Sequence, residues 1–295
     1  MTAPTTDAIA SPRPSRQRRS AVALVREGLS DLLGRRRLTR YLVGADIKRT
    51  HSDTALGQLW WIIDPLLQMA VYIVLVTIIF QRSTPDYPLF IFAAILPWKW
   101  FTTTLNDATL SVTGRQGLIR QIQFPKIVLP SSAVIAGTWS FLFGLIALGI
   151  VFMFYRDRLT IWVTLIPVIA AVQFLFTLGL GILLSSLNAF FRDIQNVLRH
   201  VLRLWFYLSP ALYSLSIVAD GNPTVYAILR LNPFAVLFDA YRSVIWGSEP
   251  TSGVYLPPGP PDWLGLIVLT GFSGLLLLFG ILIFKRAEPA FARIL

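Results

Sequence analysis

The sequence of 295 residues contains no cysteine and only two histidines. The absence of cysteine excludes disulfides, thiol nucleophiles and cysteine-ligated metals. His51 and His200 have no carboxylates beside them at the spacing of a metal site, so we expect no bound metal. No Gly-x-x-x-x-Gly-Lys-Ser/Thr loop occurs, which excludes ATP hydrolysis by that device, and no Gly-x-Ser-x-Gly elbow occurs. We therefore expect a protein that is not an enzyme and holds no cofactor of its own.

Charge is also scarce, because 14% of the residues are charged whereas 55% are hydrophobic, and the mean hydropathy is +0.63. Several apolar runs are about 20 residues long, the length that a helix needs to cross a hydrocarbon core of roughly 30 Å. These runs do not alternate between apolar and polar residues, as the strands of a membrane β-barrel would. The composition predicts an all-α integral membrane protein.

We expect six transmembrane helices, with both termini in the cytoplasm. Pro210 is expected to kink the fifth helix, and Lys285 and Arg286 to stop the last one. The expected spans are residues 59–80, 88–110, 127–154, 161–187, 202–215 and 263–284.

The expected organisation has four parts. In the second part, apolar residues of 21–33 recur at helical spacing opposite charged ones, which predicts a helix lying flat in the membrane interface. The parts are a disordered, arginine-rich tail (1–20), a cytoplasmic amphipathic interface segment (21–58), a six-helix transmembrane domain (59–284) and a cytoplasmic tail (285–295).

The net charge of +11 would suit a protein that binds nucleic acid, but the distribution of the basic residues favours another interpretation. Of the 26 lysines and arginines, 20 fall in segments expected on the cytoplasmic side, 5 on the outer side and 1 within a span. Such a bias orients membrane proteins. We therefore expect a multi-pass protein of the cytoplasmic membrane, in contact with lipids and without a nucleic-acid partner.

The segment between the fifth and sixth spans is too apolar for a plain loop. It contains two stretches, 223–231 and 233–246, and each begins with an Asn-Pro pair, Asn222-Pro223 and Asn232-Pro233. Asparagine as N-cap with proline at the first helical position is a good helix start. Each helix is too short to span a bilayer, so we expect two short re-entrant helices on the outer side.

Trp60, Trp61, Asp64 and Pro65 form the most distinctive stretch. One interpretation is an interfacial aromatic belt, with Asp64 capping a helix that starts at Pro65. The other is a tryptophan pair at the inner mouth of a path, touching a lipid headgroup or a sugar face. Both remain open from the sequence.

Lys99 lies between Trp98 and Trp100 near the middle of a predicted span, where an ionised lysine costs roughly 2.5–3.5 kcal/mol. An ion pair with Asp64 is one expectation, either as a structural pair or as part of a substrate path. The alternative is a shifted span from which Lys99 reaches the interface.

Two charged segments between predicted spans can be interpreted as ordinary connections. Residues 116–126 predict a short amphipathic helix on the cytoplasmic side, ended by Pro125, and its plain interpretation is an ordinary connector. Residues 190–203 carry several arginines and are expected to form a solvated loop that sets topology.

Several short motifs follow one another along the chain in a characteristic order. They are Asp46-Ile47-Lys48, then Leu56-Gly57 through Trp60 to Asp64-Pro65, then Phe124-Pro125-Lys126 with Leu129-Pro130, Phe191-Arg192-Asp193-Ile194, Ser209-Pro210 and Leu231-Asn232-Pro233-Phe234. From about residue 24 onward, their order and spacing resemble those of permeases of the type 2 ABC export family. The resemblance is closest to the branch that exports O-antigen, teichoic acid and similar polysaccharides.

The resemblance implies a homodimer that works with two copies of a separate ATPase subunit, and that subunit would bind ATP and Mg²⁺. The cargo would be an undecaprenyl- or decaprenyl-linked glycan, moved to the outer leaflet through a path between the two permease subunits. The residues implied for coupling to the ATPase are Arg115, Arg120, Phe124, Pro125 and Lys126. Those implied for the substrate path are Trp60, Trp61, Asp64, Trp98, Lys99 and Trp100. Those implied for an outer gate are Asn222, Pro223, Asn232, Pro233, Asp239 and Arg242.

The identity of the cargo is the least determined part of this expectation. Arginine outnumbers lysine by 22 to 4, which is typical of a GC-rich genome, and a lipid-linked galactan of an actinobacterial cell wall is the leading hypothesis. One alternative is a permease of the same fold that exports drugs or small lipids. Another is a glycosyl or phosphate transferase acting on polyprenyl lipids, although such enzymes use clustered acids and the 15 acidic residues here are scattered.

Overall fold

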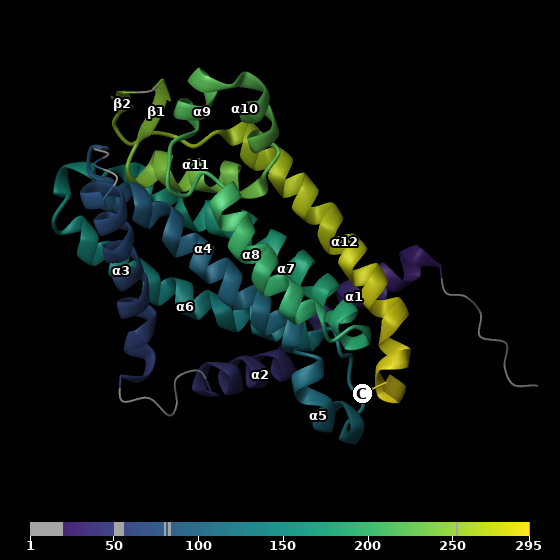
Figure 1. Ribbon diagram of the computed structural model, residues 1–295. Helices are drawn as coiled ribbons and strands as arrows, with labels where there is room; N and C mark the ends of the chain where they lie inside the picture. The colour runs from purple at the N-terminus through teal and green to yellow at the C-terminus, as the bar shows by residue number, and fades with distance from the viewer. Residues whose placement is uncertain (1–19, 50–55, 80, 82–83, 252, 295) are drawn as a thin grey trace, which may run out of the picture.

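The computed structural model describes residues 20–49, 56–79, 81, 84–251 and 253–294 (Figure 1). The predicted arginine-rich tail lies outside the described residues, apart from Ser20. The α-helices are α1 (Ala21–Gly34), α2 (Arg36–Arg49), α3 (Trp60–Ile73), α4 (Tyr87–Leu110), α5 (Gln116–Gln121), α6 (Val128–Phe152), α7 (Ile166–Phe190), α8 (Ile194–Leu208), α9 (Leu215–Gly221), α10 (Pro223–Arg230), α11 (Pro233–Ile245) and α12 (Trp263–Ile294). Shorter helical turns are η1 (Gly57–Leu59), the π-helical η2 (Val74–Ile79), η3 (Thr113–Arg115), η4 (Arg156–Arg158) and η5 (Ile161–Leu165).

α4 is the central helix of the bundle, and α3, α6, α7, α8 and α11 pack around it (Figure 1). Its first half, residues 87–98, is apolar on all sides, which is typical of a buried stretch of helix. Most of the largest fully buried residues of its first two-thirds are aromatic or branched. They include Leu89, Phe90, Ile91, Phe92, Ile95, Phe101 and Leu105.

Four of the described helical segments are long and apolar enough to cross a membrane. They are Gly57–Ile79, Val128–Phe152, Ile161–Phe190 and Trp263–Phe291, and they match the first, third, fourth and sixth predicted spans. The second predicted span corresponds to α4, which has 24 residues but carries Lys99 and Asp107. The predicted fifth span differs most from the structure.

The helix in the fifth position is α8, which has 15 residues and covers Ile194–Leu208 rather than 202–215. Pro210 ends this helix instead of kinking it, because a residue that precedes proline is forced into extended backbone. Ser209 has that conformation, with φ −92° and ψ 150°. The predicted loop 190–203 is therefore largely helical, and the predicted boundaries are wrong.

α12 also runs further than predicted, through Lys285 and Arg286 to Ile294. Lysine stops a transmembrane helix only by leaving the hydrocarbon, and a helix can continue where its charges find partners. Lys285 is only 5% exposed and contacts carboxylates of α1 and of the next helical turn. The helix therefore continues past residue 284, where the last span is predicted to end.

The helices α7 and α12 approach one another closely along much of their length. A Cβ atom on Gly280 would lie 2.7 Å from the Gly179 carbonyl oxygen, and one on Gly179 would lie 2.8 Å from the Leu277 amide nitrogen. Small residues at such a crossing let backbones pack together, which is a common device between membrane helices.

The bundle has two ends, because α3, α4, α6, α7, α8 and α12 run alternately between them. At one end Asp86 before α4 pairs with Arg158 after α6, and the Trp246 indole donates to the Pro85 carbonyl oxygen. At the other end Arg115 after α4 pairs with Asp46 of α2. We call these the Trp246 end and the Arg115 end.

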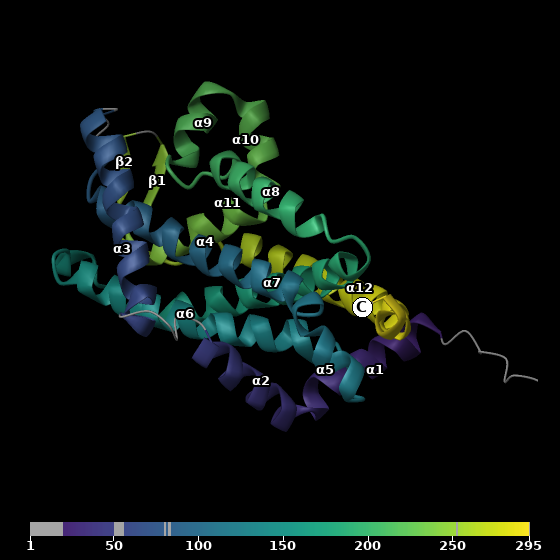
Figure 2. The same ribbon diagram turned by 60° about the horizontal axis from the view of Figure 1, so that its bottom comes forward.

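α1 and α2 lie against the bundle near the Arg115 end, together with α5 (Figure 2). The side-chain oxygen of Ser20 caps α1 by accepting from the Ala23 amide at 3.2 Å, so the predicted N-terminal helix is present. α1 packs on α12, and a Cβ atom on Gly28 would lie 2.3 Å from the Ile281 side chain. This glycine allows the close approach of the two helices.

The Trp246 end carries both helices that the Asn-Pro pairs predict. The Asn222 side chain accepts from the Thr224 and Val225 amides, and Asn232 accepts from the Phe234 amide, so both asparagines are N-caps. Two features were not predicted: α9, and a two-stranded antiparallel hairpin of β1 (Ser248–Thr251) and β2 (Val254–Leu256). The fold is therefore helical with one small hairpin and not purely α.

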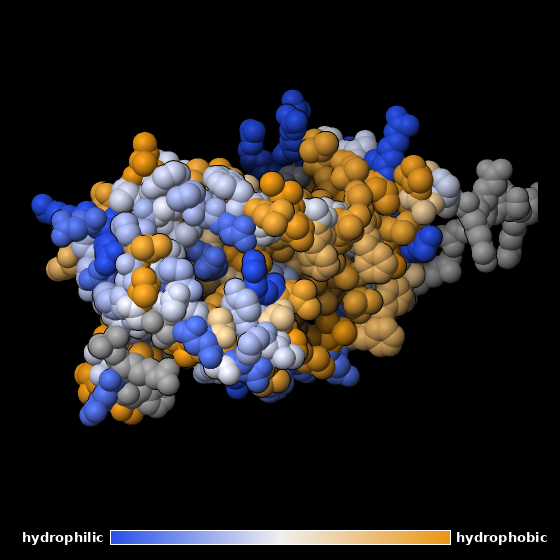
Figure 3. All heavy atoms as spheres, turned by 90° about the horizontal axis from the view of Figure 1, so that it is seen from above, coloured by the Kyte–Doolittle hydropathy of each residue, from blue (hydrophilic) through white to orange (hydrophobic). Residues whose placement is uncertain are grey.

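The surface differs between the flanks of the molecule. Viewed onto the Trp246 end, Figure 3 shows a mixed, largely hydrophilic surface on the left and a broad hydrophobic surface on the right, the side on which α12 lies. Large exposed apolar residues of α12 include Leu264, Ile267, Val268, Phe272, Leu275 and Phe279. An exposed apolar area of this kind suits contact with lipid.

Candidate functional site

Asp64 on α3 and Lys99 on α4 form an ion pair, with Lys99 Nζ 2.9 Å from Asp64 Oδ2. The expected pair is therefore present. The interpretation of Asp64 as a helix cap is wrong, because α3 begins at Trp60 and has Pro65 in its interior. The Lys99 side chain is 32% exposed and that of Asp64 is 42% exposed, so both charges reach the surface of the single chain.

Breaking this pair is expected to cost about 1–2 kcal/mol of unfolding free energy, because a partly exposed charge would lose its partner near apolar surroundings. Lys99→Met should show this loss as a lowered thermal midpoint of the protein in lipid nanodiscs. The double exchange Asp64→Lys with Lys99→Asp should recover most of it. A double exchange as unstable as the single variant would contradict a stabilising pair.

Trp98 and Trp100 do not share this exposed surface. Trp98 is 6% exposed, and its ring lies 4.7 Å from that of Phe234. Trp100 is 3% exposed and stacks on Phe141 at 4.4 Å. Neighbouring residues of a helix point about 100° apart, so only Lys99 of the three turns outward. Both tryptophans belong to the core, and we withdraw them from the predicted substrate path.

Trp60 and Trp61 are half-buried at the start of α3. The Trp61 ring lies 5.1 Å from that of Phe143 on α6, which fixes its position. Trp61 also lines a cavity of about 560 Å³ near the Arg115 end. The tryptophan pair therefore lies beside this cavity, with Trp61 in its wall.

This cavity, which we call the inner cavity, is lined by α2, α3, α4, α6 and α7, together with η3 and the first residues of α5 and α8. Its polar side chains include three guanidinium groups, two carboxylates and several amides and hydroxyls. They are Asp46, Arg49, Thr103, Asp107, Ser111, Thr113, Arg115, Gln116, Ser140, Asn188, Arg192 and Gln195. Such a lining can bind a polar or phosphorylated group by hydrogen bonds and charge.

Two residues of the inner cavity have unused hydrogen-bonding capacity. The Asn188 amide donates to the Thr109 carbonyl and the Thr113 hydroxyl, but its oxygen has no partner among the described residues. The Asp107 carboxylate makes no hydrogen bond or ion pair within the same part of the chain. Sequence reasoning missed both, although polar residues inside apolar runs are a recognised signal of function.

The predicted coupling residues do not all face outward. Arg115 pairs with Asp46 and so fastens the start of α5 to α2. Ile119 is 5% exposed and anchors α5 in the core, and Phe124 packs against the same apolar cluster. The helix ends at Gln121, not at Pro125, because Ile122 is extended with φ −128° and ψ 136°.

The end of α5 and the two residues after it form an exposed tip, which consists of Arg120, Gln121, Ile122 and Gln123. Ile122 is 53% exposed, although it is large and apolar. An exposed apolar side chain beside polar neighbours on a firmly held tip is a suitable anchor for a partner protein.

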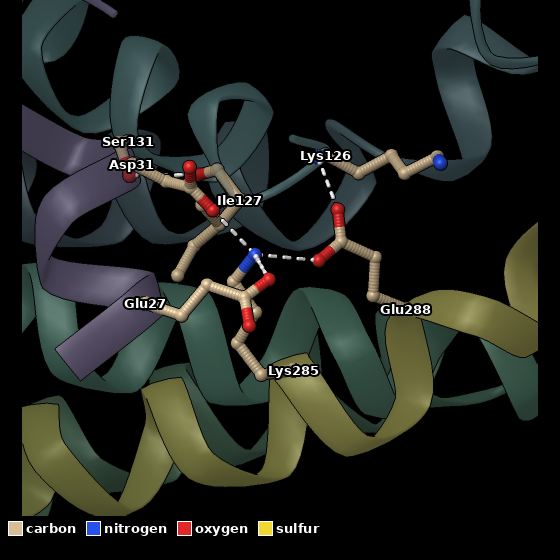
Figure 4. Close-up of polar contacts among 7 residues, drawn as sticks. All are labelled: Glu27, Asp31, Lys126, Ile127, Ser131, Lys285 and Glu288. Carbon is tan, nitrogen blue, oxygen red and sulfur yellow. Dashed lines mark hydrogen bonds and ion pairs between the residues drawn. The ribbon is translucent and has the colours of Figure 1, made fainter. Parts of the chain in front are cut away.

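A buried charge cluster connects this segment to the two ends of the chain (Figure 4). The Lys126 backbone amide donates to Glu288 Oε1 at 2.6 Å, and Lys285 Nζ donates to Glu288 Oε2 at 2.9 Å. Lys285 also contacts Asp31 and, at 3.4 Å, Glu27 of α1. Figure 4 shows the Lys126 side chain pointing away from the cluster, so only its backbone takes part. The segment after α5, α1 and α12 are thereby joined at one point.

Arg242 of α11 organises the Trp246 end. It is 6% exposed and donates to the carbonyl oxygens of Pro210 at 2.6 Å and Tyr213 at 3.3 Å, and also to that of Ala211. Its guanidinium carbon lies 3.7 Å from the centre of the Phe90 ring. Arg242 therefore holds the turn after α8 against α4 and α11.

Asn232 links the same elements. Its amide donates to the Ser209 hydroxyl at 2.8 Å, and its oxygen accepts from the Trp205 indole at 2.9 Å. Asp239 is the acidic residue of the predicted gate. It forms no hydrogen bond or ion pair among the described residues. The six predicted gate residues therefore comprise two helix caps, the two prolines that follow them, one buried arginine, and one carboxylate without a partner among the described residues.

Comparison with known proteins shows which family this chain resembles. The sequence profile of the ABC-2 type transporter family matches residues 37–246, from α2 to the end of α11. The chain belongs to the ABC-2 type transporter family. The matched region contains α4 with most of the helices around it, α5 with the exposed tip, and Arg242. The expectation of a type 2 ABC permease is confirmed.

Three relatives of this ABC-2 chain are named as O-antigen export system permeases. The O-antigen export system permease protein RfbA of Myxococcus xanthus is 32% identical over 271 residues, which cover 92% of this chain and 98% of that protein. A protein of the same name in Klebsiella pneumoniae is 28% identical over 256 residues, covering 86% of this chain and 93% of the relative. The similarity extends over nearly the whole length of these permeases.

Proposed function

We propose that the chain is the transmembrane subunit of an ATP-driven exporter that moves a polyprenyl-linked polysaccharide across the cytoplasmic membrane. The observation that carries the proposal is the near full-length similarity to O-antigen export permeases. The apolar flank and the four long apolar helices supply the membrane part. A lipid-linked galactan remains our specific proposal for the cargo.

We place six crossings in the membrane: α3, α4, α6, α7, α8 and α12, with α10 and α11 dipping into the outer leaflet. The alternation of these six helices between two ends supports this topology. The Arg115 end faces the cytoplasm in this proposal, with both termini on that side, because the majority of the basic residues fall there.

The energy comes from a separate ATPase subunit in this proposal, since the chain has no phosphate-binding loop. Two permease copies work with two ATPase copies, which bind ATP and Mg²⁺. The ATPase docks on the tip beside Ile122, and its movement reaches α1 and α12 through Glu288 and Lys285.

The cargo enters next to the inner cavity in this proposal. Trp60, Trp61, Asp64 and Lys99 contact it at the inner mouth, because they alone of the predicted path residues reach the surface of the single chain. The charged and amide groups of the inner cavity accept the headgroup. The elements held by Arg242 form the outer gate.

The sharpest test of this function compares two adjacent residues of the exposed tip. In a strain without the chromosomal gene, Ile122→Ser is expected to restore about one-tenth of the surface polysaccharide that the unaltered protein restores. Losing one apolar anchor weakens docking by roughly 1.5–3 kcal/mol, so most permeases would lack their ATPase. Gln123→Ser, the matched control, should restore export almost fully, since no apolar contact is lost.

Two results would contradict the proposal. If surface polysaccharide is unchanged when the gene is deleted, polysaccharide export is not the function. Export of drugs or small lipids is then the competing hypothesis. Equal export by the two serine variants, with polysaccharide export dependent on the gene, would remove only the docking role of Ile122.

A further inference from the structure

A second cavity lies at the Trp246 end, away from the inner cavity. It has a volume of about 260 Å³ and lies between α9, α10, α11 and β1. Pockets for drug-sized ligands begin at about 300 Å³, so this one fits a smaller ligand. We call it the outer cavity.

The walls of the outer cavity combine aromatic faces with hydrogen-bonding groups. Phe90, Tyr226 and Trp246 contribute rings, and Ser214 and Ser216 contribute hydroxyls. The Trp246 indole N–H is already bonded to the Pro85 carbonyl, so its ring is fixed as a wall. An aromatic face beside hydroxyl and charged groups suits a ligand with one apolar and one polar side.

The charged groups of the outer cavity balance one another. Arg230 and Arg242 contribute two positive charges, and Asp239 and Glu249 contribute two negative ones. The donors of Arg242 are directed to backbone carbonyls. An anion would gain little from such a lining and would meet two carboxylates, whereas a neutral polyol would meet acceptors for its hydroxyl protons.

Asp239 is the carboxylate of the outer cavity whose oxygens are not used by the described part of the chain. It lies on α11, three residues before Arg242, and its side chain is accessible from the outer cavity. It makes no hydrogen bond or ion pair with the rest of the described chain. A carboxylate in this position can accept two hydrogen bonds from neighbouring hydroxyls of one ring.

We propose that the outer cavity binds a single neutral sugar residue of the exported glycan, with Asp239 accepting its hydroxyl protons and an aromatic wall covering its ring. The proposal rests on the proposed export function and adds an outer binding subsite to it. The subsite would hold the glycan as it leaves the path. It lies within one chain, so it is present in the single permease.

The natural absence of cysteine allows a direct test. Ala219 of α9 lines the outer cavity, so Ala219→Cys in purified protein in nanodiscs should react with a small maleimide. D-galactose or D-mannose at about four times its dissociation constant should slow the reaction roughly fivefold, because about one-fifth of the cavities stay free. Inorganic phosphate at the same concentration should not slow it.

Two comparisons make the result specific. Ile217→Cys lies on the same helix, is 42% exposed and does not line the cavity, so its reaction should be unaffected by sugar. Adding Asp239→Asn to Ala219→Cys should abolish most of the protection while preserving side-chain shape. Glu249→Gln, tested in the same way, gives a second variant if Asp239→Asn does not fold.

The outcomes separate the subsite from the export function. No protection by either sugar, in an Ala219→Cys protein that still restores surface polysaccharide to the deletion strain, would overturn the subsite alone. Protection by phosphate as strong as by sugar would also overturn it, because the ligand would then be an anion. Protection that persists in both carboxylate variants would remove Asp239 and Glu249 from the site.

Discussion

Replacing Arg242 with methionine is expected to lower the free energy of unfolding by about 3–5 kcal/mol. The methionine side chain has a similar length but no donor, so the carbonyl oxygens of the turn after α8 would lose their buried partner. Each such loss costs roughly 1–3 kcal/mol. Thermal or denaturant unfolding of the protein in nanodiscs measures the effect, and weaker export should accompany it.

Two further variants test whether the guanidinium itself matters. Arg242→Lys keeps the charge but loses the planar fork of donors, and should recover less than half of the stability. Arg230→Met is the matched control, because Arg230 is 56% exposed and pairs with Asp262 at 3.5 Å, a contact worth about 0–1 kcal/mol. A loss at position 242 no larger than at position 230 would contradict the organising role of Arg242.

Hydropathy predicts the long helices of this protein well, because an apolar run must be helical wherever it meets lipid. The predicted spans agree with α3, α6, α7 and α12 to within a few residues at each end, except that α12 continues past its predicted end. The Asn-Pro pairs were equally informative, since capping depends only on neighbouring residues. These features are local, and a single sequence contains them.

The predicted fifth span begins too late, because arginines in the sequence favour a loop on the cytoplasmic side although α8 includes them. Arg199 and Arg203 are exposed, but helix formation does not exclude them. Leu198, Leu202 and Phe206 recur every four residues and form its buried stripe. This period was visible in the sequence, and it would have placed the start of the helix nearer residue 194.

The sites were harder to predict than the helices, because they join segments that no periodicity relates. Arg115 is 69 residues from its partner Asp46, and Lys285 is 254 residues from Asp31. The prediction for Trp98 and Trp100 is wrong for the same reason, because their partners Phe234 of α11 and Phe141 of α6 are distant in the sequence. The pair of Asp64 and Lys99 was accessible to sequence reasoning because the two helices are consecutive.

Replacing Lys285 with methionine is expected to lower the free energy of unfolding as much as Arg242→Met does. Lys285 is the cation between Asp31, Glu288 and Glu27, whose side chains are 19%, 14% and 40% exposed. Removing the buried partner of such carboxylates costs about 3–5 kcal/mol, because their charges would repel one another without compensation. The thermal midpoint in nanodiscs should fall accordingly.

The neighbouring Arg286 gives the control. It separates the loss of the charge cluster from the loss of any cation in this turn of α12. Arg286→Met removes an exposed cation from the same helical turn and should leave the midpoint nearly unchanged. Adding Asp31→Asn and Glu288→Gln to Lys285→Met should recover stability, because the uncompensated charges are then gone. Export should not recover with it, since α1, α12 and the Lys126 amide would no longer be joined through charge. Stability that stays low in the triple variant would show that Lys285 acts by packing alone.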